Sequence, residues 1–110
     1  MRNISVEKAF DMLSDNNTTL IDVRGISECE IDGRPDVKNS ILITISSDLD
    51  EFEDILESNL PDKNQKILFI CRSGGRSMKA SMIAEQMGYM NCYNVEGGFT
   101  NWKSHDLPSK

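Results

Sequence analysis

The chain has 110 residues, a length typical of a single domain, and a formal net charge of −6, which disfavours a nucleic-acid-binding surface. Its mean hydropathy is −0.42, and its longest apolar run spans only residues 67–71, far short of the roughly 20 residues that cross a bilayer. Three cysteines without Cys-x-x-C spacing and a single histidine argue against a zinc site and favour the reducing cytoplasm, so we expect no metal, membrane or nucleic-acid partner.

Hydrophobic periodicity predicts helices and strands that alternate along the whole chain. Ser5 is a candidate N-cap for the first helix, and Gly88 is well placed just after the end of the helix over residues 80–87. In chain order, the pattern predicts a helix over residues 6–13, a strand over 19–23, one or two helical turns within 25–32, a strand over 40–45, a helix over 49–56, a strand over 66–70, a helix over 80–87, a strand over 91–95 and a short helix over 99–103.

This alternation predicts an α/β fold in which helices cover both faces of a parallel sheet. No Asn-Gly or Asp-Gly hairpin signal joins two strands, and the run Lys66–Ile70 is continuously apolar after its first residue, as both-face burial requires. Without a repeat or a linker, residues 1–110 are expected to form one domain. Ligands of such folds bind beyond the carboxyl ends of the strands, which is where Cys71 is expected.

Charge is distributed unevenly, and the uneven part surrounds that cysteine. Residues 1–65 carry 6 Lys and Arg against 15 Asp and Glu, whereas residues 66–110 carry 6 against 3. Arg72, Arg76 and Lys79 account for half of the second group of cations. An anion is therefore expected to bind near Cys71.

The segment Cys71–Ser77, C-R-S-G-G-R-S, combines a nucleophile with an anion cradle. Two adjacent glycines let the loop curl so that several backbone N–H groups point to one centre. The following helix is expected to begin five or six residues after Cys71. It adds about half a positive charge and Arg76 a full one, conditions under which the pKa of a cysteine falls to about 3.5–7.5. Cys71 is thus the candidate nucleophile, and the candidate substrate-binding residues are Arg72, Ser73, Gly74, Gly75, Arg76 and Ser77.

The loop resembles the active-site loop of the rhodaneses, sulfurtransferases that carry a persulfide on cysteine. Residues 20–24, L-I-D-V-R, followed by Glu28, and residues 96–102, which read E-G-G-x-x-x-W, resemble two further motifs of that family in the expected order. The resemblance implies a three-layer fold with a central five-stranded parallel sheet, in the single-domain form. The chain departs from the family at Arg34–Lys38, where Gly-His-Ile-Pro-Gly-Ala is usual, and at Cys29, where an aromatic residue is usual.

By this resemblance Cys71 takes the outer sulfur of a small anionic donor such as thiosulfate and passes it to a thiol or cyanide, without a cofactor. A thioredoxin-like or sulfur-carrier protein is a further candidate acceptor. Arg76 is expected to brace the loop, and Arg72 to attract the donor. Asp22 and Arg24 are expected to form a charge pair under the loop in a supporting role.

Loop length separates the nearest enzymatic rivals. Cys71 to Arg76 is Cys-x4-Arg, one residue shorter than the Cys-x5-Arg of protein tyrosine phosphatases, in which Ser77 would be the arginine. The narrower ring suits a persulfide better than a tetrahedral phosphate. Two alternatives without sulfur transfer remain: an interaction module, which typically lacks the cysteine, and a redox sensor, in which an exposed Cys29 would pair with Cys71. Cys92 is expected in the core.

Overall fold

In the computed structural model, which describes residues 1–110, strands and helices alternate along the chain as the sequence predicts. The elements are β1 (Arg2–Ile4), α1 (Val6–Met12), β2 (Thr18–Asp22), α2 (Ile26–Asp32), β3 (Ser40–Leu42), α3 (Leu49–Asn59), β4 (Lys66–Ile70), α4 (Gly75–Gln86), β5 (Asn91–Val95) and α5 (Gly98–Ser104). The longest helix, α4, has 12 residues, and no helix is long and apolar enough to span a membrane.

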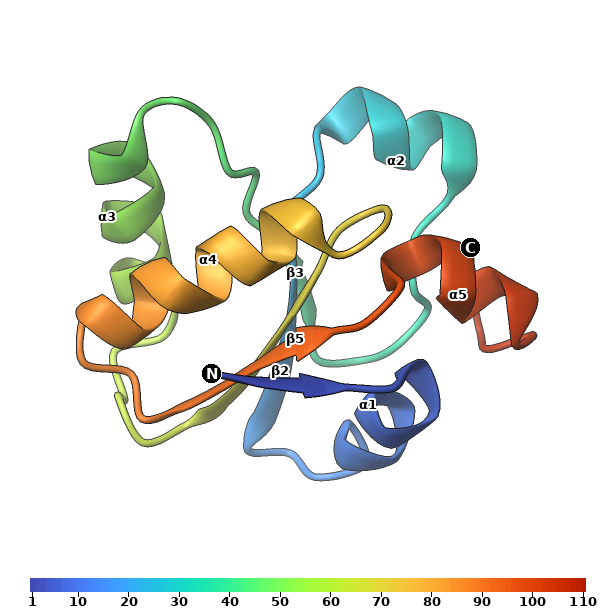
Figure 1. Ribbon diagram of the computed structural model, residues 1–110, viewed down its shortest axis with the longest axis horizontal. Coiled ribbons are helices and arrows are strands. Elements are labelled where there is room, and N and C mark those ends of the chain that lie inside the picture. Colours follow the sequence, from blue (N-terminus) through green and yellow to red (C-terminus); the bar gives the residue numbers. More distant parts are fainter.

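The five strands form one parallel sheet in the order β1-β5-β4-β2-β3. Helices α3 and α4 cover one face, and α1 and α5 cover the other, on the left and the right of Figure 1 respectively. The architecture is therefore the expected three-layer α/β fold with a central five-stranded parallel sheet. Helix α2 lies at the carboxyl ends of the strands, near the loop that leads into α4 (Figure 1).

The two apolar faces of β4 explain its unbroken apolar sequence. Side chains of a strand alternate between the two faces of a sheet. Ile67 and Phe69 belong to the core beneath α3 and α4, whereas Leu68 and Ile70 belong to the core beneath α1 and α5. All four are completely buried, so every position of this stretch must be apolar.

The strand boundaries differ from the sequence prediction at the edges of the sheet. Strands β4 and β5 have the predicted limits, but β1 is absent from the prediction because Arg2–Ile4 has only three residues and mixes polar with apolar side chains. Its pairing with β5 exists only in the folded chain. At the other edge, β3 ends at Leu42, although Ile43 and Ile45 still donate backbone hydrogen bonds to residues 22 and 23.

The divergent segment Arg34–Lys38 is held by the end of the chain. Pro35 forms an antiparallel bridge with Ser109. Since Pro35 has no N–H, the neighbouring residues make the hydrogen bonds: the N–H groups of Arg34 and Asp36 donate to the carbonyl groups of residues 110 and 108, at 2.7 and 2.8 Å. The segment that departs from the family pattern therefore pairs with residues 108–110, which lie far from it in the sequence.

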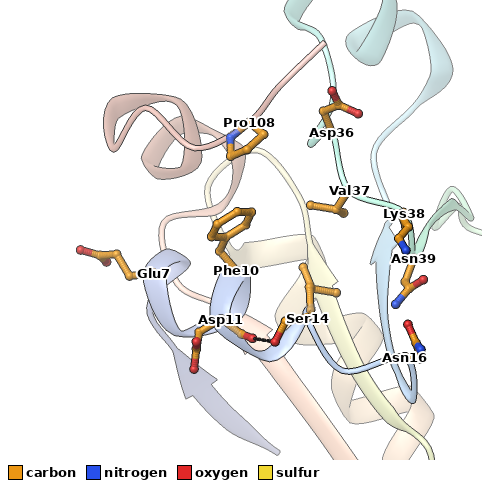
Figure 2. A pocket seen from close by; sticks show the side chains of 11 residues that line it. Glu7, Phe10, Asp11, Ser14, Asn16, Asp36, Val37, Lys38, Asn39 and Pro108 are labelled. Carbon is orange, nitrogen blue, oxygen red and sulfur yellow. Dashed lines mark hydrogen bonds between the residues drawn. The ribbon is translucent and has the colours of Figure 1, made fainter.

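The largest groove on the molecule lies away from Cys71. It has a volume of about 610 Å³ and runs between α1 and residues 36–39. Figure 2 shows Phe10, Val37 and Pro108 facing it, with acidic and amide side chains around them. None of its lining residues belongs to the segment Cys71–Ser77, so this groove adds nothing to the predicted site.

Candidate active site

Cys71 is the first residue after the central strand β4, and the following loop turns directly into α4. The helix begins at Gly75, one or two residues before the start that the sequence predicts, five or six residues after Cys71. Gly74 is its N-cap and has φ = 112°, a left-handed conformation that glycine adopts without a steric penalty. This turn brings the first residues of α4, Ser77 among them, back over the cysteine.

The sulfur of Cys71 lies inside this turn, within hydrogen-bond distance of two of its groups. The N–H of Gly74 donates to Sγ at 3.1 Å, and the Ser77 Oγ lies 3.3 Å from Sγ. Cys71 is only 1% exposed, and burial by itself raises the pKa of a thiol. The Ser77 hydroxyl and the backbone N–H groups of Ser77, Gly74 and Ser73 outweigh that effect and hold the pKa of Cys71 below its ordinary value.

The E-G-G motif after β5 anchors the loop from the other side. The N–H groups of Phe99 and Thr100, in the first turn of α5, donate to the carbonyl groups of Cys71 and Arg72 at 2.8 and 3.1 Å. A Cβ atom on Gly98 would lie 2.6 Å from the carbonyl oxygen of Arg72. Only glycine therefore allows α5 to approach the loop this closely.

Arg76 is bound to α2 rather than directed at the sulfur. Its guanidinium group donates to both carboxylate oxygens of Glu28, at 2.5 and 2.8 Å. The hydrogen bonds from Arg76 and from the N–H of Gly25 lower the pKa of Glu28 to about 2. The pair links the start of α4 to α2. Glu28 is the partner of Arg76 that the sequence left without an assigned role.

Asp22 and Arg24 form the expected charge pair, and both side chains are buried. Arg24 Nη2 lies 2.7 Å from Asp22 Oδ2 and also donates to the carbonyl of Gly33 at 2.9 Å. The guanidinium group of Arg24 stacks on Phe99 of α5, 4.4 Å from the ring centre. The pair links the end of β2 with α5 and with the end of α2, which are the elements that surround the loop.

The remaining predicted site residues differ in exposure. Arg72, Ser73, Gly75 and Arg76 are exposed, whereas Gly74 and Ser77 are buried with Cys71. The side chain of Arg72 is therefore accessible to solutes.

The thiols of the other two cysteines have raised pKa values. Cys92 is buried in the core, and burial raises its pKa to about 11. Cys29 is also buried, with its sulfur 3.8 Å from Asp22 Oδ2. Burial is the larger cause of its raised pKa, and the negative charge of the Asp22 carboxylate is the second. Exposure of Cys29 was the condition for its pairing with Cys71, and the structure does not meet it.

Sequence reasoning missed Asn94 of β5, which accepts a 2.5 Å hydrogen bond from the Ser77 hydroxyl through Oδ1. The signal available in the sequence was a polar residue inside a strand whose two faces are both covered. No group of three or more His, Cys, Asp and Glu side chains has the arrangement of a metal site.

The chain is similar to known proteins over nearly its whole length. Residues 5–105 match the rhodanese-like domain family. A Rickettsia rickettsii protein, named as an uncharacterized RP600 homolog, is 40% identical over 98% of this chain and 96% of its own. The thiosulfate sulfurtransferase GlpE of Actinobacillus succinogenes is 30% identical over 96% of this chain and 86% of its own. The solved polysulfide-sulfur transferase homodimer of Wolinella succinogenes superposes with a TM-score of 0.86 at 31% identity, over 100% of this chain and 78% of that chain.

Proposed function

Because the chain belongs to the rhodanese-like domain family, we propose that it is a sulfurtransferase that carries sulfane sulfur as a persulfide on Cys71. The observation that carries the proposal is the hydrogen-bonded sulfur of Cys71 at the start of α4, whose pKa lies below the ordinary value. Two similar proteins, one named a thiosulfate sulfurtransferase and one a polysulfide-sulfur transferase, support the same chemistry.

The reaction consists of two nucleophilic displacements at sulfur. The Cys71 thiolate attacks the outer sulfur of thiosulfate, a new S–S bond forms, the donor's S–S bond breaks and sulfite leaves with the electron pair. A thiolate or cyanide then attacks the outer sulfur of Cys–S–S⁻ and regenerates the Cys71 thiolate. The N–H groups of the loop stabilise the negative charge in both forms of the enzyme, which is the contribution expected of preorganised donors.

Partners and location follow from the same chemistry. The donor is a small anion, attracted by the exposed Arg72, and the acceptor is cyanide, a small thiol, or a thioredoxin-like or sulfur-carrier protein. Free thiols such as these three cysteines stay reduced in a reducing compartment, so we propose that the reaction takes place in the cytoplasm. The intact Cys71 weighs against a non-catalytic module, and the burial of Cys29 weighs against a disulfide-forming sensor.

Intact mass spectrometry after incubation with thiosulfate tests the proposal. We expect one added sulfur atom per chain, removed by dithiothreitol or by cyanide. Cys71→Ser should take up no sulfur and lose thiosulfate:cyanide transfer, because its hydroxyl stays protonated at neutral pH. Cys92→Ser is the matched control and should load as the parent chain does. Loading that persists in Cys71→Ser would show that the persulfide forms elsewhere and contradict the proposal.

A further inference from the structure

Behind the reactive loop, a chain of polar side chains connects Cys71 with β1. Cys71 Sγ lies 3.3 Å from Ser77 Oγ, Ser77 Oγ donates to Asn94 Oδ1 at 2.5 Å, and Asn94 Nδ2 donates to Asn3 Oδ1 at 3.0 Å. Asn94 is 2% exposed, although a buried amide is costly unless all its hydrogen bonds are made. The resemblance of the loop to the rhodanese motif does not explain why β5 carries a buried amide at this position.

The orientation of the Asn94 amide is determined by its neighbours. Asn94 Nδ2 lies 3.4 Å from the carbonyl oxygen of Gly74, which can only accept a hydrogen bond. The amide nitrogen must therefore face Gly74, and the amide oxygen Oδ1 must face Ser77. A flipped amide would place two oxygens against each other at Gly74.

This orientation decides where the single proton of the Ser77 hydroxyl points. An amide oxygen is an acceptor only, so the short contact between Ser77 and Asn94 requires the hydroxyl proton to lie between them. Ser77 Oγ then offers a lone pair, not a proton, to the sulfur of Cys71. That geometry suits a thiol, which donates its S–H, and does not suit an anionic sulfur, which needs a donor.

Building on the sulfurtransferase function proposed above, we propose that Asn94 is a positioning residue that competes with the Cys71 sulfur for the Ser77 hydroxyl proton. In the resting thiol the proton belongs to Asn94. When the sulfur becomes a thiolate or a persulfide anion, the hydroxyl turns to it, and Asn94 gives up its short hydrogen bond. Asn94 thus sets how strongly Ser77 stabilises the anionic sulfur, without touching the reacting atoms itself.

The elements around this series of hydrogen-bonded side chains also carry charged groups. Each of these groups either has an oppositely charged partner or is not a member of the series. Arg76 of α4 is bound to Glu28 of α2, and Asp22 at the end of β2 is bound to Arg24. Arg72 of the loop is exposed, and Glu96, beyond β5, lines the small cavity of about 390 Å³ that Asn94 also borders. The proton choice at Ser77 is therefore made between two uncharged acceptors, or between Asn94 and the sulfur anion.

The test is the pH dependence of Cys71 alkylation by iodoacetamide, followed by mass spectrometry. Asn94→Leu removes the competing acceptor at similar volume, so the midpoint should fall by about one pH unit, the effect of one hydrogen bond to an ionised group. In a Ser77→Ala background the same substitution should leave the midpoint unchanged, since no hydroxyl proton remains to redirect. An unchanged midpoint in Asn94→Leu, or an equal shift in both backgrounds, would overturn the proposal.

Asn91→Leu is the matched control, because Asn91 lies in the same strand and donates to the carbonyl of Asn64, away from the loop. It should not move the midpoint, and an equal shift there would assign the effect to general loosening of β5 and overturn the proposal. If Asn94→Leu fails to fold by circular dichroism, Asn94→Asp keeps both the volume and the acceptor. Its midpoint should rise, and should rise less in the Ser77→Ala background; an equal rise in both contradicts the proposal.

Alkylation needs no sulfur donor, so the two proposals can fail separately. A correct shift in chains that never load sulfur would leave the role of Asn94 intact and remove the sulfurtransferase function. Normal sulfur loading without a shift of the alkylation midpoint would support the sulfurtransferase function and refute the role of Asn94.

Discussion

The three cysteines show that hydrogen bonding, rather than burial, distinguishes the nucleophile. All three are buried, and burial raises the pKa of each thiol. Only Cys71 has backbone N–H groups and a hydroxyl oxygen within hydrogen-bond distance of its sulfur, and only its pKa is lowered. Cys29 instead faces the Asp22 carboxylate, which disfavours a thiolate further. Reactivity at this scale depends on which polar groups converge on the sulfur.

At the residue scale, we predict that the Cys71 thiolate persists below the range of an ordinary cysteine. Because the folded pKa is lowered, the ionised fraction at a given pH is larger, and alkylation by iodoacetamide should continue well below pH 8. Restricted access of the reagent to the buried sulfur slows the reaction at every pH, so the pH midpoint rather than the absolute rate reports the pKa. Cys92, with a pKa of about 11, should stay unmodified over the same range. A Cys71 midpoint at or above the free-cysteine value of about 8.5 would contradict the hydrogen-bonded site.

At the element scale, the site is assembled by three elements that meet at the carboxyl ends of the strands. Helix α4 carries the loop, α2 holds it through Glu28 and Arg76, and α5 holds its carbonyl groups through two backbone N–H donors. These contacts are made by groups whose own positions are set by other elements. The conformation of the loop therefore depends on how the helices around it are packed. A substitution that displaces α5 should change the surroundings of the Cys71 sulfur.

Gly98→Ala tests that dependence, because its Cβ would collide with Arg72 and its φ is +58°. We expect the free energy of unfolding to fall by more than the roughly 1–3 kcal/mol of backbone strain, and persulfide formation to fall with it. Gly88→Ala is the matched control: its φ is +103°, but no atom lies within 4 Å of the added Cβ. It should show the strain alone, with normal sulfur loading. Equal effects of the two variants on stability and loading would show that the approach of α5 is unimportant.

At the scale of the whole molecule, the last residues close the fold against the segment that departs from the family pattern. Ser109 pairs with Pro35, and the indole N–H of the buried Trp102 donates to the carbonyl of Pro108 at 2.8 Å. The tail therefore ties α5 to the connection between α2 and β3. This closure lies outside the reactive loop, so it should contribute to stability rather than to chemistry.

Removal of residues 108–110 should lower the free energy of unfolding by about 1–3 kcal/mol, since the backbone hydrogen bonds to residues 34–36 and the partner of Trp102 are lost. Sulfur loading of Cys71 should stay at the parental level under folding conditions. Lys110→Ala, which removes only the exposed ion pair with Asp36, should change stability by less than about 1 kcal/mol. Denaturant unfolding measures all three chains, and a truncated chain as stable as the parent would refute a closing role for the tail.

What could be predicted from the sequence is local. The limits of β4 and β5 follow from short runs of side chains that pack on both faces of the sheet, and the loop chemistry of Cys71–Ser77 follows from neighbours within one turn. The sequence places the start of α4 at residue 76 or 77, one or two residues beyond the observed Gly75, because the exact start depends on the left-handed backbone of Gly74, which a glycine permits but does not require.

The amino-acid sequence by itself determined the parallel α/β architecture and indicated Cys71 as the candidate nucleophile, because periodicity and a cysteine beside glycines and cations are properties of adjacent residues. Only the tertiary structure decided that β1 pairs with β5 as an edge strand, that Glu28 forms an ion pair with Arg76, and that Asn94 accepts a hydrogen bond from Ser77. Each joins residues that lie far apart along the chain. Such pairs acquire their geometry only when the sheet forms and brings the carboxyl ends of its strands to one edge.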